Sequence, residues 1–265
     1  MASHFSTIGF PLKSADEFRA LAMQVVDDCA SLDCPQGRYL RWSSPSGAEL
    51  WLQANADNNL VGMLPHFSGE SAVRVGLTDR VTRPDATALD GAFYGWASPA
   101  DDDPESGCYP LVFDTPDFLL HHGLQLPAIV EAQVAAFAHE ISLYPSVEAY
   151  DASLPPAGPN PENPEMLVAA RGLDSQAFIP SGTFIPGGGV IDPPQAHAIF
   201  TGHILKTEAR CNELTGREFW WALVESYGGI YDVVIDAELV EDAPRVGGVV
   251  NGTFWLSGRV LDGQE

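Results

Sequence analysis

The stretch from residue 196 to residue 260 decides the fold class, because three β-like runs follow one another in it. The runs are AHAIFTGHILKTEARC (196–211), EFWWALVESYGGIYDVVID (218–236) and VVNGTFWLSGRV (249–260). Turn-forming residues separate or interrupt them at Asn212–Gly216, Gly228–Gly229 and Gly247–Gly248. Short strands joined by glycine-containing turns are typical of small all-β units. We therefore expect a small, self-contained β-barrel in this part of the chain.

The N-terminal part has the pattern of a mixed sheet with one main helix. Ser14 and Glu17 form a capping pattern, and apolar residues then recur at helical spacing from Phe18 to Val26. This helix is expected to end near Cys29–Asp33. A Pro/Gly turn at Ser44–Gly47 predicts a hairpin. The strand candidates are His4–Leu12, Arg38–Ser43, Glu49–Ala54, Asn59–Phe67, Ser71–Thr82, Gly91–Ser98 and Tyr109–Phe113.

The segment Leu126–Tyr144 fits a helix and a strand nearly equally well. Pro127 and the β-branched and aromatic residues favour a strand. Ser146–Ala152 has the pattern of a short helical turn. Leu154–Pro164 contains five prolines, which neither a helix nor a sheet interior can use. The glycine run Gly187–Gly189 is a second break.

These patterns predict a predominantly β, α+β protein in two parts. A mixed α+β domain covers residues 1–153, a proline-rich linker or loop covers 154–175, and a small β-barrel domain covers 176–265. The length of 265 residues suits two domains.

The composition is strongly acidic, with 13 Lys+Arg against 36 Asp+Glu and a formal net charge of −23. Such a charge repels phosphate backbones and attracts basic partners or cations. It also has the simpler effect of promoting solubility. Nucleic acid is therefore an unlikely ligand, and a basic protein is the partner that the charge favours. The sequence does not decide between a monomer and a homo-oligomer.

The chain is expected to be cytoplasmic. Its first residues lack the basic and apolar regions of a secretory signal, and no apolar run is long enough for a membrane span. Cys29, Cys34, Cys108 and Cys211 show no metal-binding spacing. They are interpreted as small buried hydrophobes in a reducing compartment, with a Cys29–Cys34 disulfide as the alternative.

The first 67 residues resemble one βαβββ module of the vicinal-oxygen-chelate (glyoxalase/bleomycin-resistance) superfamily. The resemblance rests on His4 in the first predicted strand, on the helix start at Ser14–Glu17 and on the turn at Ser44–Gly47. It implies a metal ligand on the first strand and a Glu four residues after the hairpin glycine. Trp51 holds that second place and Glu49 lies two residues earlier, so the resemblance implies a lost metal centre.

The last third resembles an OB-type five-stranded barrel, with a long first strand (His197–Ala209), a glycine-linked pair around Gly228–Gly229 and a last strand (Val250–Val260). Proteins of that architecture bind nucleic acid, sugars or proteins. The architecture alone assigns no function.

No motif specific for catalysis is found, and no catalytic residue, metal or cofactor is predicted. His197 and His203 would lie about 20 Å apart on one strand, and the side chains of His121 and His122 would diverge. The ionisable side chains are expected to lie too far apart to meet. Of the consecutive Trp220 and Trp221, one must face the barrel interior, and the N-terminal domain, a subunit or a ligand must cover the other. The candidate ligand-binding residues are His4, Glu49, Trp51, His66, Trp220 and Trp221.

Three functions remain from this pattern. The first is a non-enzymatic binding or interaction protein with a basic partner. The second is a small-molecule enzyme or binding protein of the vicinal-oxygen-chelate type, with His4, Glu49 and His66 as polar groups. The third, which the charge disfavours, is an OB-type nucleic-acid binder.

Overall fold

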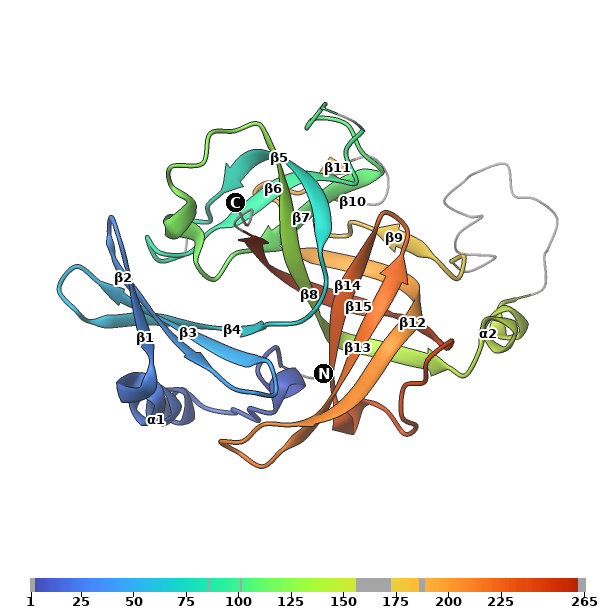
Figure 1. Cartoon of the computed structure of the whole chain (residues 1–265), viewed down its shortest axis with the longest axis horizontal. Coiled ribbons are helices and arrows are strands. Elements are labelled where there is room, and N and C mark those ends of the chain that lie inside the picture. Colours follow the sequence, from blue (N-terminus) through green and yellow to red (C-terminus); the bar gives the residue numbers. More distant parts are fainter. Residues whose placement is uncertain (1–2, 85, 101, 156–172, 186–188, 262–265) are drawn as a thin grey trace.

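The computed structural model describes residues 3–84, 86–100, 102–155, 173–185 and 189–261, and in them the protein is built mainly from strands (Figure 1). This confirms a predominantly β protein with some helix. The helices are α1 (Ala15–Val25) and α2 (Val147–Ser153), and the 3-10 turns are η1 (Ser6–Ile8), η2 (Val26–Asp28), η3 (Phe118–His121) and η4 (Ala237–Leu239).

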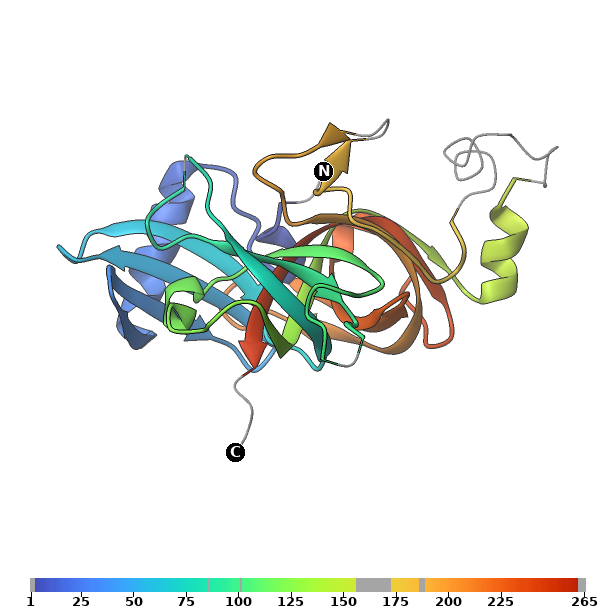
Figure 2. The same ribbon diagram turned by 90° about the horizontal axis from the view of Figure 1, so that it is seen from above.

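A four-stranded antiparallel sheet forms the N-terminal part, in the order β1-β2-β3-β4. Its strands are β1 (Ala30–Cys34), β2 (Gly37–Ser43), β3 (Ala48–Asn55) and β4 (Leu60–Phe67). Helix α1 lies beside this sheet (Figures 1 and 2). The helix begins as expected, because the Ser14 side chain accepts a hydrogen bond from the Glu17 backbone N–H. Its Leu21 and Val25 are buried.

A nine-stranded sheet forms the rest of the fold, in the order β13-β14-β8-β5-β6-β7-β15-β12-β9. Its strands are β5 (Val73–Val81), β6 (Ala92–Ala97), β7 (Tyr109–Asp114), β8 (Ala128–Tyr144), β9 (Ala177–Ile179), β12 (His197–Cys211), β13 (Glu218–Ser226), β14 (Gly229–Asp236) and β15 (Val249–Leu261). The short strands β10 (Phe184–Ile185) and β11 (Gly189–Val190) form a separate two-stranded sheet.

Two additional pairings, β13–β12 and β8–β15, close this sheet into two rings. One ring is β8-β14-β13-β12-β15 and the other is β8-β5-β6-β7-β15, so the long strands β8 and β15 belong to both. Since even an eight-stranded barrel has an interior just wide enough for side chains, rings of five strands are filled by their own residues. The fully buried aromatic side chains fit that expectation; they include Phe93, Phe113, Phe137, Phe200, Tyr231 and Phe254.

The C-terminal barrel is not self-contained, which corrects the first expectation. Strand β8, from the predicted N-terminal domain, pairs with β14 in parallel and with β15 along most of its length. One sheet therefore continues across the division expected at 154–175. Most of that proline-rich segment, residues 156–172, lies outside the described residues, as does most of the glycine run at 187–189.

The predicted strand His4–Leu12 is wrong. Ser3 and Ser6 exchange side chain–backbone hydrogen bonds, and Gly9 ends η1 in the left-handed region at φ 85°. These local bonds favour a tight turn over an extended chain. The leading strand of a βαβββ module is absent from the described residues, and the additional strand β1 begins where helix α1 was expected to end.

The other local predictions agree with the structure. The hairpin β2–β3 turns at Ser44–Gly47, the segment 126–144 forms the strand β8, and 146–152 forms the helix α2. The cysteines are an exception: all four are free, but Cys108 and Cys211 are exposed and Cys29 and Cys34 are only partly buried, so the prediction of buried hydrophobes is wrong. In the described part of the chain, no helix has the length and apolar character needed to cross a bilayer.

Candidate functional site

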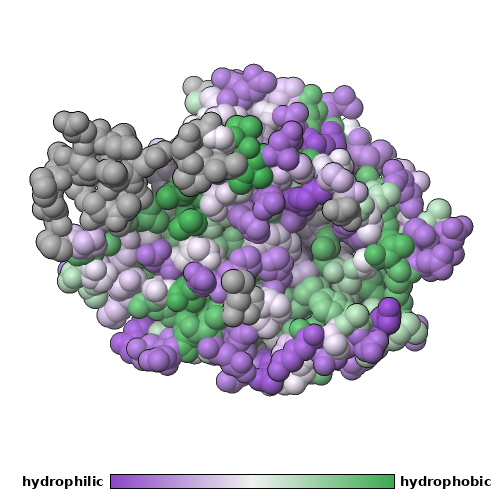
Figure 3. Space-filling view, turned by 180° about the vertical axis from the view of Figure 1, so that it is seen from behind, coloured by the Kyte–Doolittle hydropathy of each residue, from purple (hydrophilic) through white to green (hydrophobic). Residues whose placement is uncertain are grey.

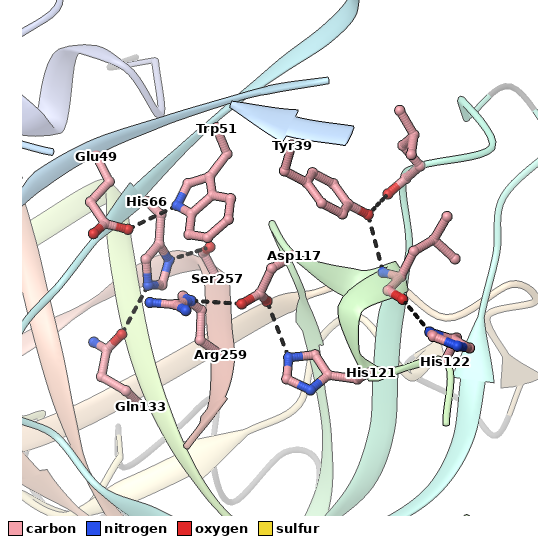
Figure 4. Close-up of polar contacts among 12 residues, drawn as sticks. Tyr39, Glu49, Trp51, His66, Asp117, His121, His122, Gln133, Ser257 and Arg259 are labelled. Atoms are coloured by element: carbon pink, nitrogen blue, oxygen red, sulfur yellow. Dashed lines mark hydrogen bonds and ion pairs between the residues drawn. The ribbon is translucent and has the colours of Figure 1, made fainter. Parts of the chain in front are cut away.

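Polar side chains from both sheets meet where β4 lies against β8 and β15 (Figure 4). His66 of β4 is fully buried between two partners. Its Nδ1 lies 2.8 Å from Ser257 Oγ on β15, and its Nε2 lies 2.9 Å from Gln133 Oε1 on β8. Ser257 is 1% exposed and Gln133 is 6% exposed, so the chain of contacts is closed to solvent.

Asp232 of β14 fixes the direction of every hydrogen bond in this chain. Its Oδ2 accepts from Gln133 Nε2 at 2.7 Å and from the Ser71 backbone N–H at 2.9 Å, while Oδ1 accepts from Trp221 Nε1 at 2.8 Å and from the Glu70 backbone N–H at 2.9 Å. Because the amide nitrogen of Gln133 must face this carboxylate, its oxygen must face His66.

The tautomer of His66 follows from that orientation. An amide oxygen only accepts, so the imidazole carries its hydrogen on Nε2 and presents a bare Nδ1 to Ser257. The Ser257 hydroxyl then donates to Nδ1. We call this chain, Ser257–His66–Gln133–Asp232–Trp221, the buried relay. Burial, the largest influence, lowers the pKa of His66 below its ordinary value, although the nearby Glu49 raises it.

A second group of polar side chains lies beside the buried relay. Glu49 is directly opposite His66 in the β3–β4 pair, and its carboxylate accepts from Trp51 Nε1 at 2.8 Å. The Arg259 guanidinium lies 4.8 Å from the centre of the Trp51 ring and donates through Nε to Asp117 at 2.8 Å.

Asp117 also lies close to His121. Its other carboxylate oxygen lies 3.4 Å from His121 Nε2. Burial alone would raise the pKa of the Asp117 carboxyl, but the contacts with His121 and Arg259 lower it below its ordinary value. The acid is thus held as an anion between two cationic or cation-forming groups.

The arrangement contains a serine–histidine pair but gives a substrate no access to it. A hydroxyl that donates to an imidazole is the first step of nucleophile activation. Ser257 and His66 are, however, 1% and 0% exposed, and the ordinary catalytic site is a cleft that admits its substrate. The buried relay therefore acts as a framework, because it satisfies the polar groups of five strands and ties the two sheets together.

Three histidines from remote parts of the chain also meet, so the expectation that ionisable groups lie too far apart is wrong. Nε2 of His4 and Nε2 of His139 are 2.7 Å apart, and the ring centres of His139 and His197 are 5.9 Å apart. His139 is the extra residue of a β-bulge in β8, since Phe254 pairs with Ala138 and Thr253 with Glu140. Bulges of this kind re-aim side chains.

The His4 ring is fixed by stacking and hydrogen bonding. It lies parallel to the Trp255 ring at 4.1 Å between centres, with an interplanar angle of 4°. Burial, followed by His139 and His197, lowers the pKa of His4 to about 3. Burial likewise lowers the pKa values of His139 and His197. The pair His4–His139 is thus a hydrogen bond between neutral rings.

This contact leaves no room for a metal between the two nitrogens. A tetrahedral ion at about 2.0–2.1 Å from each would hold them more than about 3 Å apart. Among the residues that the structure describes, no group of three or more His, Cys, Asp or Glu side chains is arranged to hold a metal ion.

The structure places the six candidate residues in three surroundings. Glu49, Trp51 and His66 come together, as their shared face on neighbouring strands allows. His4 stacks instead on Trp255, two residues along β15 from Ser257, so it does not join His66. His121 and His122 bond different partners, Asp117 and the Leu119 carbonyl, as expected from their divergence.

The two consecutive tryptophans differ in exposure. Trp221 is 3% exposed and Trp220 is half-buried. Phe67 of β4 and the Arg210 guanidinium, 4.5 Å from the ring centre, cover Trp221. Trp221 therefore belongs to the contact between the two sheets, and its indole N–H ends the buried relay.

Sequence reasoning missed Gln133, Asp232, Ser257, Asp117 and Arg259. The signal that it could have used is a polar residue between small or apolar neighbours in a strand, as at Gln133 in AIVEAQVAAFA and at Ser257 in GTFWLSG. A polar side chain that is buried in such a run needs a partner. The partner itself cannot be read from the run.

The chain matches no known protein-family model, no curated protein and no solved structure.

Proposed function

We propose that this chain is a non-enzymatic interaction protein whose acidic surface binds a basic protein partner. The observation that carries the proposal is the placement of the negative charge on folded elements throughout the described chain. Exposed carboxylates lie on α1 (Asp16, Glu17), β5 (Asp79), α2 (Glu148) and β13 (Glu225). Thirteen lysines and arginines cannot neutralise 36 acidic residues, whichever ion pairs form. Such a surface attracts positively charged partners and speeds their encounter.

The interior supports a binding role rather than a catalytic one. The groups with the most reactive arrangement, Ser257 and His66, are closed to solvent and engaged in the buried relay. The polar atoms of their partners in the buried relay also have hydrogen bonds within it. The function is therefore assigned to the surface.

The two alternatives need features that this arrangement does not favour. A vicinal-oxygen-chelate-type enzyme would need His4, Glu49 and His66 around one point, whereas His4 bonds His139. A stoichiometric divalent ion in the purified protein would revive that alternative. An OB-type nucleic-acid binder would need a basic groove with stacking aromatics, and oligonucleotide binding at physiological salt would support it.

The proposal is tested by cross-linking the purified chain in a lysate of its source cells at low salt and identifying the proteins recovered. We expect proteins of net positive charge that are lost when salt is raised, because exposed charges are screened. Replacing Asp16, Glu17, Asp27 and Asp28 by their amides should reduce capture. Recovery of only neutral or acidic proteins, or only of copies of this chain, would refute the proposal.

A further inference from the structure

An apolar groove lies between α1 and the start of β4. Its volume is about 440 Å³, and its lining includes Phe18, Ala22, Met23, Leu60 and Met63, together with Arg19. In the space-filling view from behind, apolar side chains gather over the side of the molecule that α1 and the four-stranded sheet form (Figure 3). The groove has the size of an ordinary ligand or side-chain pocket.

The apolar side chains at this groove are unusually exposed. Met23 is 67% exposed and Leu60 is 41% exposed. Two of the eight large exposed hydrophobic residues of the described chain therefore line the same groove. Contiguous apolar surface on a soluble domain marks a place that another molecule covers.

The helix side of the groove has the shape that receives another helix. Phe18 and Ala22 are four residues apart, as are Arg19 and Met23, so they form two parallel ridges along α1. Helices pack by placing the side chains of one into the channel between such ridges of the other. A partner helix would place anchors at i, i+3, i+4 and i+7 into the channel.

Carboxylates lie on the segments that adjoin the two elements of this groove. Asp27 and Asp28 follow α1 directly in η2, and Asp57 lies in the β3–β4 turn, three residues before Leu60; all three are exposed. The cation in the lining, Arg19, is already paired with Asp16 at 3.1 Å. Apolar anchors flanked by lysine or arginine would complement this pattern.

We propose that the groove between α1 and β4 is the docking surface for a basic amphipathic helix of the protein partner; this inference rests on the function proposed above. A second copy of this chain is the less suitable occupant. Each copy carries a formal charge of −23, and a self-complementary contact would bring the same carboxylates together.

The test uses a short leucine–lysine peptide with leucines at helical spacing, and measures its dissociation constant for the whole chain by fluorescence anisotropy. Two peptides serve as controls: a scrambled sequence of the same composition, and a leucine–glutamate helix. The double variant Met23→Ser/Leu60→Ser removes the anchors, and Val246→Ser, at a residue 65% exposed elsewhere, is the matched control.

We expect the leucine–lysine helix to bind. The double variant should raise its dissociation constant about tenfold or more, since burial of one such side chain changes affinity about tenfold or more. Val246→Ser should leave this dissociation constant unchanged within about twofold. Equal binding by the double variant, or equal binding of the scrambled or acidic peptide, would overturn the groove assignment and leave the proposed function standing. Dimerisation that the double variant abolishes would overturn it in favour of a second copy. If no basic peptide binds even at low salt, the proposed function itself fails.

Discussion

Replacement of Asp232 by asparagine should change the tautomer of His66, which is two residues away from Asp232 along the buried relay. An asparagine that keeps its oxygen toward Glu70 and Trp221 places an NH₂ group toward Ser71 and Gln133, where Oδ2 now accepts two hydrogen bonds. Gln133 can respond by rotating its amide, so that its oxygen accepts from the asparagine. Its NH₂ group then faces His66 Nε2, and the imidazole must move its hydrogen to Nδ1 and donate to Ser257.

The expected loss of stability can be worked out from the bonds. The Ser71 backbone N–H is left buried without an acceptor, which costs about 1–3 kcal/mol. The remaining bonds to residue 232 lose the charge of the carboxylate, and charge-assisted bonds are about twice as strong as neutral ones. Together these effects predict that the free energy of unfolding falls by about 3 kcal/mol.

Two measurements check this prediction. Urea denaturation gives the change in unfolding free energy, and the ¹⁵N chemical shifts of the His66 ring report which nitrogen carries hydrogen. We expect Nε2–H in the native chain and Nδ1–H in Asp232→Asn. Ser43→Ala, which alters a hydroxyl bonded to Glu49 outside the relay, is the control. A native Nδ1–H tautomer, or a variant as stable as the native chain, would refute the assigned directions of the hydrogen bonds in the buried relay.

Two further predictions concern residues that pack against Asp232 and Trp255. Gly69→Ala should destabilise the fold by about 1–3 kcal/mol, because its Cβ would lie 2.1 Å from Cγ of Asp232, which four donors hold in place; a denaturation midpoint equal to that of the native chain would contradict this. For His4, the folded pKa of about 3 lies below the unfolded value of about 6.5, so the unfolded chain binds more protons between them. The contribution of His4 to the free energy of unfolding is present above pH 6.5 and is lost as the pH falls toward 3, by up to about 1.4 kcal/mol per pH unit. His4→Phe, which keeps the ring on Trp255, should flatten that slope in denaturation curves, and an unchanged slope would show that His4 does not titrate in this way.

Local chemistry predicted the local elements correctly. The Ser14 cap, the turn at Ser44–Gly47 and the glycine-linked pair of strands around Gly228–Gly229 each concern residues close in sequence, and the cap and both turns formed where expected. Two segments are exceptions. His4–Leu12 has side chain–backbone bonds that compete with an extended chain, and Ala30–Cys34 forms the strand β1 where the helix was expected to end.

The site could not be predicted because its partners are distant along the chain. His66 and Ser257 are 191 residues apart, and His4 and His139 are 135 apart. They meet because β4 and the segment before η1 lie against β15 and β8. Nothing in the last third of the sequence indicates that β8 completes its barrel. Glu49, Trp51 and His66 were recognisable because neighbouring strands of one sheet carry them.

The central claim is that ligand recognition takes place on the surface at α1 and β4, while the polar interior is a closed framework. NMR titration of the whole chain with the leucine–lysine helix tests both halves at once. We predict shifts at the methyl groups of Met23 and Leu60 and unchanged ring nitrogens at His66. Shifts at His66 and Ser257, with Met23 and Leu60 unaffected, would contradict the claim.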